Sequence, residues 1–199
     1  MSQEEQDTTV FNTIKRRRSI GKMTEQRPTR EQIERMLEAA THAPNHRKVE
    51  PWKFFVLAGK SRHELGEIMA GVQASRMENT TSEKALAVLN KERAKPLRAP
   101  VLIVVAAEQP HQDNVVEIEN VEATAAAVQN MLLVADEMGL SCMWRTGDAA
   151  YDPYVKQWLG LAQDDHIVAI VYVGYPAIPS LERHPVSIEK KAAWLGWQD

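Results

Sequence analysis

Two amphipathic segments open the chain. Residues 10–18 have helical composition and end in a cluster of basic side chains. A second helix is predicted to begin after Thr29, because Thr29 as N-cap and Gln32 three residues later form a capping-box pattern before an apolar face. This helix should end before Pro44, since the residue preceding a proline disfavours the helical conformation.

Four later segments have the composition of strands. Residues 52–58 (WKFFVLA) and 166–174 (HIVAIVYVG) are dense in aromatic and branched side chains, and 141–144 is a shorter run of the same kind. Residues 100–107 (PVLIVVAA) are apolar without alternation, which predicts a strand buried on both faces.

Helices are expected between these strands. Residues 60–95 have helical composition with a polar middle, and we expect two helices joined by a mobile stretch from 75 to 83. Residues 153–159 predict a short helix. Helices at the start followed by strands and helices in turn indicate an α+β fold. We expect one domain over residues 1–199, with residues 1–9 flexible and 177–199 forming an extended tail on a partner subunit.

The segment 116–138 predicts the longest helix, and Gly139 follows it as a natural C′ residue. An apolar seam runs along this helix in steps of three and four residues: Val121, Ala125, Val128, Leu132 and Ala135. Trp194 and Trp197 add apolar surface in the tail. Because one small core needs less apolar surface than this, we interpret the seam and the two tryptophans as an interface with a second subunit.

The composition excludes several classes of protein. Of the 199 residues, 44% are hydrophobic and 26% are charged, as in ordinary globular proteins. A net charge of −3 does not favour nucleic acid or an anionic membrane as a partner, and no apolar run is long enough to span a bilayer. Cys142 is the single cysteine, and the first residues do not form a signal peptide. We expect a cytoplasmic protein without nucleic-acid or membrane partners.

A basic turn, Arg16-Arg17-Arg18-Ser19, is the first candidate site. Guanidinium groups and a hydroxyl beside backbone N–H groups are the parts that hold a phosphate monoester. Taken alone, the turn is more simply interpreted as a solvated helix end, where basic side chains are common.

The loop Ala43–Trp52 (APNHRKVEPW) is the second candidate. Two prolines frame it, so that Asn45 and His46 could be presented to a ligand with little ordering cost. The alternative interpretation, which the sequence supports equally well, is that this loop only connects a helix to a strand beside a buried Trp52.

The third candidate is Met143-Trp144-Arg145-Thr146-Gly147 at the end of a short strand, where an indole, a cation and a glycine could border an anionic aromatic ligand. A buried tryptophan beside a surface arginine explains the same residues. The chain has no GxGxxG, GxxxxGK[ST] or GxSxG motif, and Pro44 breaks the helix that His42 and His46 would need for HExxH zinc chemistry. No metal site is expected.

Taken together and in this order, the three candidates resemble the nitroreductase family of FMN-dependent flavoproteins, in particular its shorter bacterial members. The resemblance covers about residues 13–176. It is carried by Arg17-Arg18-Ser19, Ala43-Pro44-Asn45-His46 with Pro51-Trp52, and Trp144-Arg145-Thr146.

The resemblance implies a mixed sheet flanked by helices in a domain-sharing homodimer, with FMN in two clefts at the subunit interface. Arg17, Arg18 and Ser19 would hold the phosphate, His42 and His46 would reach the flavin bound mainly by the partner subunit, and Trp144, Arg145 and Thr146 would line the ring and tail. The segment 134–139 matches a region assigned to nicotinamide contact.

By the same resemblance, the protein would be an NAD(P)H oxidoreductase. NADPH or NADH would reduce the flavin, which would pass hydride to nitroaromatics, quinones or similar small oxidants by a ping-pong mechanism. Flavin N5 carries this chemistry, so no side chain is assigned a catalytic role. A specialised reductase or dehalogenase, or a flavin-binding module with little turnover, is the alternative on this scaffold.

Four positions depart from the family pattern. Many members have a basic residue two positions after the motif serine, where this chain has Gly21 followed by Lys22. Lys48 and Glu50 replace an asparagine and a glutamine before the Pro-Trp pair, and Arg183 is the candidate for a basic residue near the C-terminus that often aids the phosphate.

Overall fold

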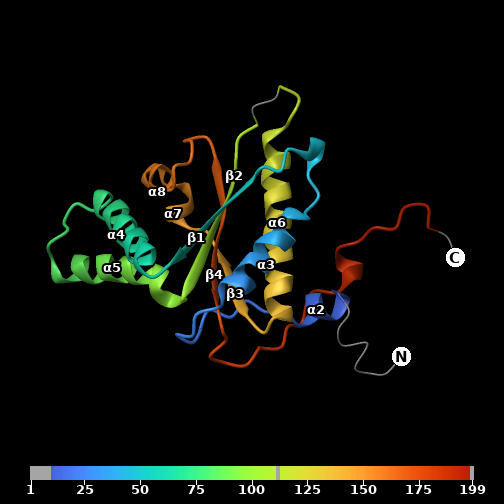
Figure 1. Cartoon of the computed structure of the whole chain (residues 1–199), viewed down its shortest axis with the longest axis horizontal. Helices are drawn as coiled ribbons and strands as arrows, with labels where there is room; N and C mark the ends of the chain where they lie inside the picture. The colour runs from blue at the N-terminus through green and yellow to red at the C-terminus, as the bar shows by residue number, and fades with distance from the viewer. Residues whose placement is uncertain (1–9, 111–112, 198–199) are drawn as a thin grey trace.

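The computed structural model describes residues 10–110 and 113–197. A four-stranded sheet lies at its centre, with helices on both faces (Figure 1). The strands have the order β1-β2-β4-β3 and the bounds Trp52–Ala58 for β1, Val101–Ala107 for β2, Ser141–Arg145 for β3 and His166–Gly174 for β4. The expected flexibility of residues 1–9 concerns a segment outside the described residues.

The α+β fold is confirmed. All three strand pairs are antiparallel, and parallel pairing in the described chain is limited to an isolated bridge between Ser19 and Cys142. This bridge places the segment after the basic turn along the free edge of β3, the strand that ends the sheet. The fold therefore connects the first candidate site directly to the third.

Strand β2 is buried on both faces, as its unbroken apolar sequence predicts, and its residues alternate between two core clusters. Ile103 and Val105 belong to the cluster that also contains residues of α3 and α6. Leu102 and Val104 belong to the cluster that contains residues of α4, α7 and α8. The sheet thus separates the molecule into two layers of helices, as Figure 1 shows.

The first layer contains α2 (Val10–Arg16), α3 (Arg30–Thr41) and α6 (Glu117–Glu137). The capping box of α3 is confirmed: the Gln32 amide donates to Thr29 Oγ1 at 3.2 Å, and the Thr29 amide donates to Gln32 Oε1 at 3.0 Å. Helix α2 ends at Arg16, two residues earlier than expected, so Arg17 and Arg18 lie in the turn that follows it.

Helix α6 has the expected length, but the structure corrects the interpretation of its seam. Val128, Leu132 and Ala135 are buried in the core beneath α6, whereas Val121 and Ala125 are half-buried. The interface hypothesis for this face is therefore wrong for three of its five residues. Their apolar spacing reflects packing against the chain's own sheet, which uses the same periodicity as an interface would.

The second layer contains α4 (Lys60–Ser75), α5 (Glu83–Ala94), α7 (Asp148–Tyr151) and α8 (Pro153–Leu159). Two helices over residues 60–95 are confirmed, with a turn at 76–82 between them. A short 3-10 helix, η2 (Lys95–Arg98), follows α5 directly and leads into β2. The described helices include none with the length and apolar character needed to cross a membrane.

The tail begins against the body of the chain and then leaves it. Met23 forms a bridge with Pro176, and the Ala177 amide donates to the carbonyl of Lys22 at 2.9 Å. Further along, apolar side chains are exposed: Leu181, Val186, Ile188, Trp194, Leu195 and Trp197. The short 3-10 helix η3 (Ile188–Lys190) lies within this stretch.

Candidate functional site

In the basic turn, Arg16 forms ion pairs within the chain, whereas Arg17 has a donor that could bind a ligand. Arg16 pairs with Asp136 at 2.9 Å and Glu137 at 2.5 Å, so it fastens α2 to the C-terminal end of α6. The Nη1 atom of Arg17 is buried and has no hydrogen-bond partner within the described chain. A buried donor without an acceptor costs free energy, which a bound anion would recover.

Arg18 and Ser19 complete this turn in different ways. The Arg18 guanidinium donates to the carbonyls of Lys15 at 2.6 Å, Arg17 at 2.8 Å and Leu181 at 2.8 Å. Arg18 therefore holds the turn and the start of the tail together. Ser19 is exposed at its bridge with Cys142, so its hydroxyl is accessible to a ligand beside Arg17.

The chain runs from this turn along the edge of β3 towards the third motif. A Cβ atom placed on Gly21 would lie 2.8 Å from Met143 Cε and 3.8 Å from an Arg145 guanidinium nitrogen. Since Ser19 pairs with Cys142, Arg145 lies three residues further along β3, roughly 10 Å away at the usual strand rise. The segment from Ser19 to Gly21 covers this edge, so an elongated ligand that reaches from Arg17 to Arg145 would lie over that segment.

Neighbouring residues of the third motif point to opposite faces of the sheet. Trp144 packs on the α6 side, where its indole Nε1 donates to the carbonyl of Val168 at 3.1 Å. Arg145 and Thr146 instead line a pocket on the α4 side. Alternation along β3 places Trp144 and Arg145 on opposite faces, and Thr146 lies beyond the end of the strand. Trp144 is not among the residues that line this pocket.

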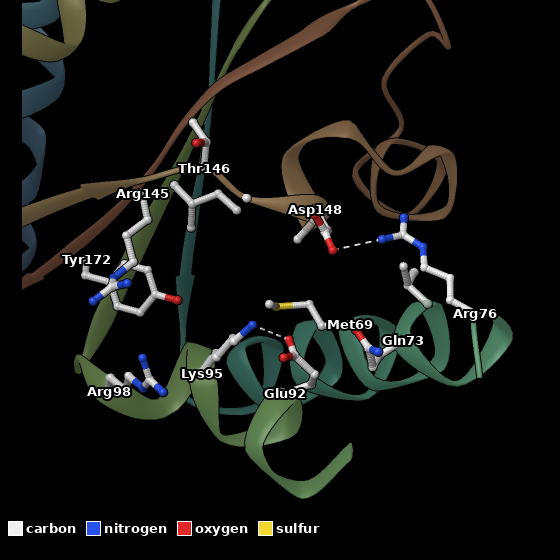
Figure 2. Close-up of a pocket in the computed structure, with 14 residues that line it drawn as sticks. Met69, Gln73, Arg76, Glu92, Lys95, Arg98, Arg145, Thr146, Asp148 and Tyr172 are labelled. Carbon is white, nitrogen blue, oxygen red and sulfur yellow. Dashed lines mark hydrogen bonds and ion pairs between the residues drawn. The ribbon is translucent and has the colours of Figure 1, made fainter. Parts of the chain in front are cut away.

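The pocket has a volume of about 370 Å³ and lies between α4, η2 and the segment from Arg145 to Ala149 (Figure 2). Arg76, the C-cap residue of α4, forms an ion pair with Asp148 across the outer side of the pocket at 2.9 Å. Lys95 pairs with Glu92 at 2.5 Å on its floor. Sequence reasoning missed Arg76, Lys95 and their neighbours, because each is an isolated charge in a helical segment and only the packing of α4 and η2 brings them together.

The proline-framed loop has an unusual backbone. Arg47, Lys48 and Glu50 have φ values of 54°, 56° and 48°, in the left-handed region that side-chain-bearing residues rarely adopt. The Glu50 amide donates to Asn45 Oδ1 at 2.9 Å and so fixes the loop. Backbone strain of this kind is concentrated at functional sites, which supports the interpretation of the loop as more than a connection.

The two histidines of this region lie in different surroundings. His46 Nδ1 lies 2.6 Å from Glu119 Oε2, near the N-terminal end of α6. His42 lines a separate, largely apolar groove that also includes Val10, Leu133 and Glu137, near the C-terminal end of α6. Both side chains are exposed to solvent.

Within one chain, the basic turn and His46 do not share a site. Arg16 forms an ion pair with Glu137, and His46 lies against Glu119. Glu119 and Glu137 are eighteen residues apart on α6. At 1.5 Å per residue, these positions are separated by roughly 27 Å. A single ligand that contacts Arg17 and a copy of His46 must therefore use the His46 of another chain.

Other reactive groups are not arranged for catalysis. Burial raises the pKa of the Cys142 thiol to about 12, so the thiol is protonated and unreactive at neutral pH. The described part of the chain brings no three His, Cys, Asp or Glu side chains together in an arrangement that could hold a metal ion.

The comparisons with known proteins agree with this architecture. The model of the nitroreductase family matches residues 14–175, which include all three motifs. The chain belongs to the nitroreductase family.

Individual relatives share most of their length with this chain. YdjA from Escherichia coli strain K12, provisionally named an NAD(P)H nitroreductase, is 33% identical over 168 residues, covering 81% of this chain and 85% of YdjA. A nitroreductase-like family protein from Bacillus cereus has a TM-score of 0.79 and 28% identity, covering 96% of this chain and 97% of its own. A provisionally named nitroreductase from Desulfovibrio desulfuricans, solved in complex with FMN, has a TM-score of 0.70 at 23% identity, covering 96% of this chain and 99% of its own.

Proposed function

We propose that the protein is an FMN-dependent NAD(P)H oxidoreductase that reduces nitroaromatics, quinones or similar small oxidants. The observation that carries the proposal is the line from Arg17 along the edge of β3 to Arg145. A buried donor without an acceptor stands at one end of this line, and a pocket opens at the other. This arrangement suits a ligand with an anionic group at one end and a planar ring at the other.

Each residue on this line has a role toward FMN. Arg17 would donate to the phosphate and Ser19 would add a hydroxyl, whereas Arg18 acts through the backbone that it holds. Arg145 and Thr146 would border the ring, and Trp144 would support their strand from its other face. Bound FMN would supply the hydride-accepting and hydride-donating atom. The side chains bind and orient the reactants, which is how a protein contributes to flavin chemistry.

The proposed site is shared between two copies of the chain. An isologous pairing about a two-fold axis, with α6 antiparallel to its twin, would bring the Arg17 end of one chain to the His46 loop of the other. Exposed apolar side chains on α2 support such a contact: Val10 is 72% exposed and Phe11 is 66% exposed beside the groove that holds His42. Apolar surface of this kind marks an interface. The tail after Pro176 would pack on the partner.

One pocket would serve both substrates in turn. Nicotinamide and oxidant must each approach the same flavin ring, and a cavity of about 370 Å³ beside Arg145 accommodates one of them at a time. Alternating occupancy predicts ping-pong kinetics, with parallel lines in double-reciprocal plots.

Absorption spectroscopy tests the cofactor. The purified protein should show an FMN spectrum that is bleached by NADPH or NADH and restored by a nitroaromatic or a quinone. Arg17→Ala should weaken FMN binding by about 1.5–3 kcal/mol, the range for a lost hydrogen bond to a charged group. Arg35→Ala is the control, because Arg35 is exposed on α3 outside the three candidate motifs. Unchanged FMN affinity in Arg17→Ala would show that the basic turn is an ordinary helix end.

Subunit complementation tests the shared site. Arg17→Ala and His46→Ala proteins should each lose FMN affinity, and mixing them after dissociation should produce heterodimers with one intact site and one doubly altered site. Random reassociation restores roughly a quarter of the wild-type sites. No recovery, or a folded flavin-loaded monomer in sedimentation, would refute the shared site.

A further inference from the structure

The pocket at the end of β3 contains more positive charge than its own carboxylates balance. Arg76 is paired with Asp148, and Lys95 is paired with Glu92. The remaining pocket cations, Arg98 and Arg145, make no ion pair with any residue in the described ranges 10–110 and 113–197. Two exposed guanidinium groups therefore face this cavity without a counter-charge.

These two guanidinium groups both lie near one buried tyrosine, Tyr172. Arg145 lies over the ring of Tyr172, with its Cζ atom 5.7 Å from the ring centroid. Arg98, from η2, lies near the same ring, and the Tyr172 hydroxyl points into the pocket (Figure 2). Tyr172 is 6% exposed, and it lines the pocket together with both arginines.

The protonation state of this tyrosine suits an anionic ligand. Burial raises the pKa of Tyr172, while Arg145 and Arg98 act in the opposite direction. The net shift is upward, so the hydroxyl is a neutral donor at physiological pH. Two guanidinium forks and one hydroxyl donor are the groups that bind a carboxylate in a partly enclosed site.

We propose that this pocket selects oxidants that carry a carboxylate or a comparable anionic group, with Arg98 as a specificity-determining residue. The inference rests on the proposed function, because it assigns the pocket to the substrate of the flavin reaction. Arg98 and Arg145 would attract and orient the anionic group, and Tyr172 would donate to it.

The cofactor itself does not account for these charges. The anionic part of FMN is its phosphate, which the proposed function places at Arg17 and Ser19, at the other end of the β3 edge. The oxidised ring system is neutral and the reduced ring carries at most one negative charge, which Arg145 alone would balance. Arg98 in particular comes from η2, an element that does not contribute to the basic turn.

A matched pair of oxidants tests the proposal on the FMN-loaded protein. 4-Nitrobenzoate and methyl 4-nitrobenzoate share one ring and one nitro group and differ by a negative charge. Because the two also differ in intrinsic reactivity, the readout is the ratio of their kcat/KM values, followed by oxidation of NADPH. Arg98→Ala should lower the carboxylate-to-ester ratio by about tenfold or more, as expected for losing a charged hydrogen bond. Arg98→Gln, which keeps a donor and removes the charge, should lower it as well.

Two controls separate the possible outcomes. Arg35→Ala removes a charge outside the pocket and should leave the ratio at the wild-type value. FMN retention and the melting temperature are measured for each variant, and both should stay at wild-type values in Arg98→Gln, since Arg98 makes no ion pair within the described residues.

Several results would overturn the inference. A carboxylate-to-ester ratio of kcat/KM within twofold of wild type in both Arg98 variants would show that the pocket does not discriminate between charged and neutral oxidants. Loss of FMN from Arg98→Gln would assign the pocket to the cofactor. If the Arg98 variants reduce the ester at the wild-type rate and the carboxylate-to-ester ratio does not change, the pocket does not select anionic oxidants, and the proposed oxidoreductase activity is unaffected. If FMN-loaded protein oxidises NADPH with neither compound nor any quinone, the proposed function fails as well.

Discussion

The two glycines of α4 provide a direct test of how this helix packs beside the pocket. Gly66 faces α5, and a Cβ atom placed on it would lie 2.4 Å from the carbonyl oxygen of Arg93. Gly71 lies on the exposed side of the same helix, where a Cβ atom would meet nothing within 4 Å. Replacing either glycine by alanine adds one methyl group to the same helix. Only the methyl group at Gly66 meets a backbone atom of a neighbouring helix.

The expected effects have opposite signs. In a helix interior, alanine is favoured over glycine by about 1 kcal/mol, and this gain applies at both positions. At Gly66 the new methyl group must push α5 away, which costs about 1–3 kcal/mol for overpacking and more where a backbone atom is the obstacle. Gly71→Ala should therefore stabilise the protein by about 0.5–1 kcal/mol, and Gly66→Ala should destabilise it by about 1–2 kcal/mol.

Thermal unfolding at one protein and FMN concentration measures both effects. For a chain of this size, 1 kcal/mol corresponds to about 2–4 °C, so Gly66→Ala should melt roughly 2–8 °C below wild type and Gly71→Ala slightly above it. Because α4 also supplies Met69 and Gln73 to the pocket, Gly66→Ala should additionally raise KM for the oxidant. An increase in melting temperature for both variants would refute the α4–α5 packing.

Two further predictions concern the thiol and the tail. The Cys142 thiol, with a pKa raised by burial to about 12 from an ordinary value of 9.0, should react with iodoacetamide in denaturant and not in the native protein. Because the pKa of Cys142 is raised in the folded state, the contribution of this thiol to the free energy of unfolding is complete below pH 9 and is lost as the pH rises towards 12. Cys142→Ala should therefore lose less stability than the wild type between pH 9 and pH 12. Equal losses in the two proteins would contradict the buried position of the thiol. Trp194→Ala with Trp197→Ala should weaken subunit association in sedimentation, because both side chains are more than 60% exposed in the single chain; an unchanged association constant would exclude the tail from the interface.

Some features of the site were accessible from local sequence alone. The capping box at Thr29 and the apolar run in β2 follow from interactions within a few residues, and both are confirmed. The opposite orientation of Trp144 and Arg145 also follows from strand periodicity, once the strand is extended by one residue to Arg145. The position of Arg98 and Tyr172 beside Arg145 was not accessible, because they come from separate elements without a common motif.

The sequence by itself determined the four strands, the longer helices and the three motifs, because helix caps, strand alternation and short polar loops depend on near neighbours in the chain. The tertiary structure decided which faces are covered and which charges meet. Val128 and Leu132 became core residues, Arg16 became an anchor for α6, and Arg17 was left with a buried donor. The physical reason is that periodicity records only that a face is apolar, whereas the partner of that face is set by the packing of distant segments.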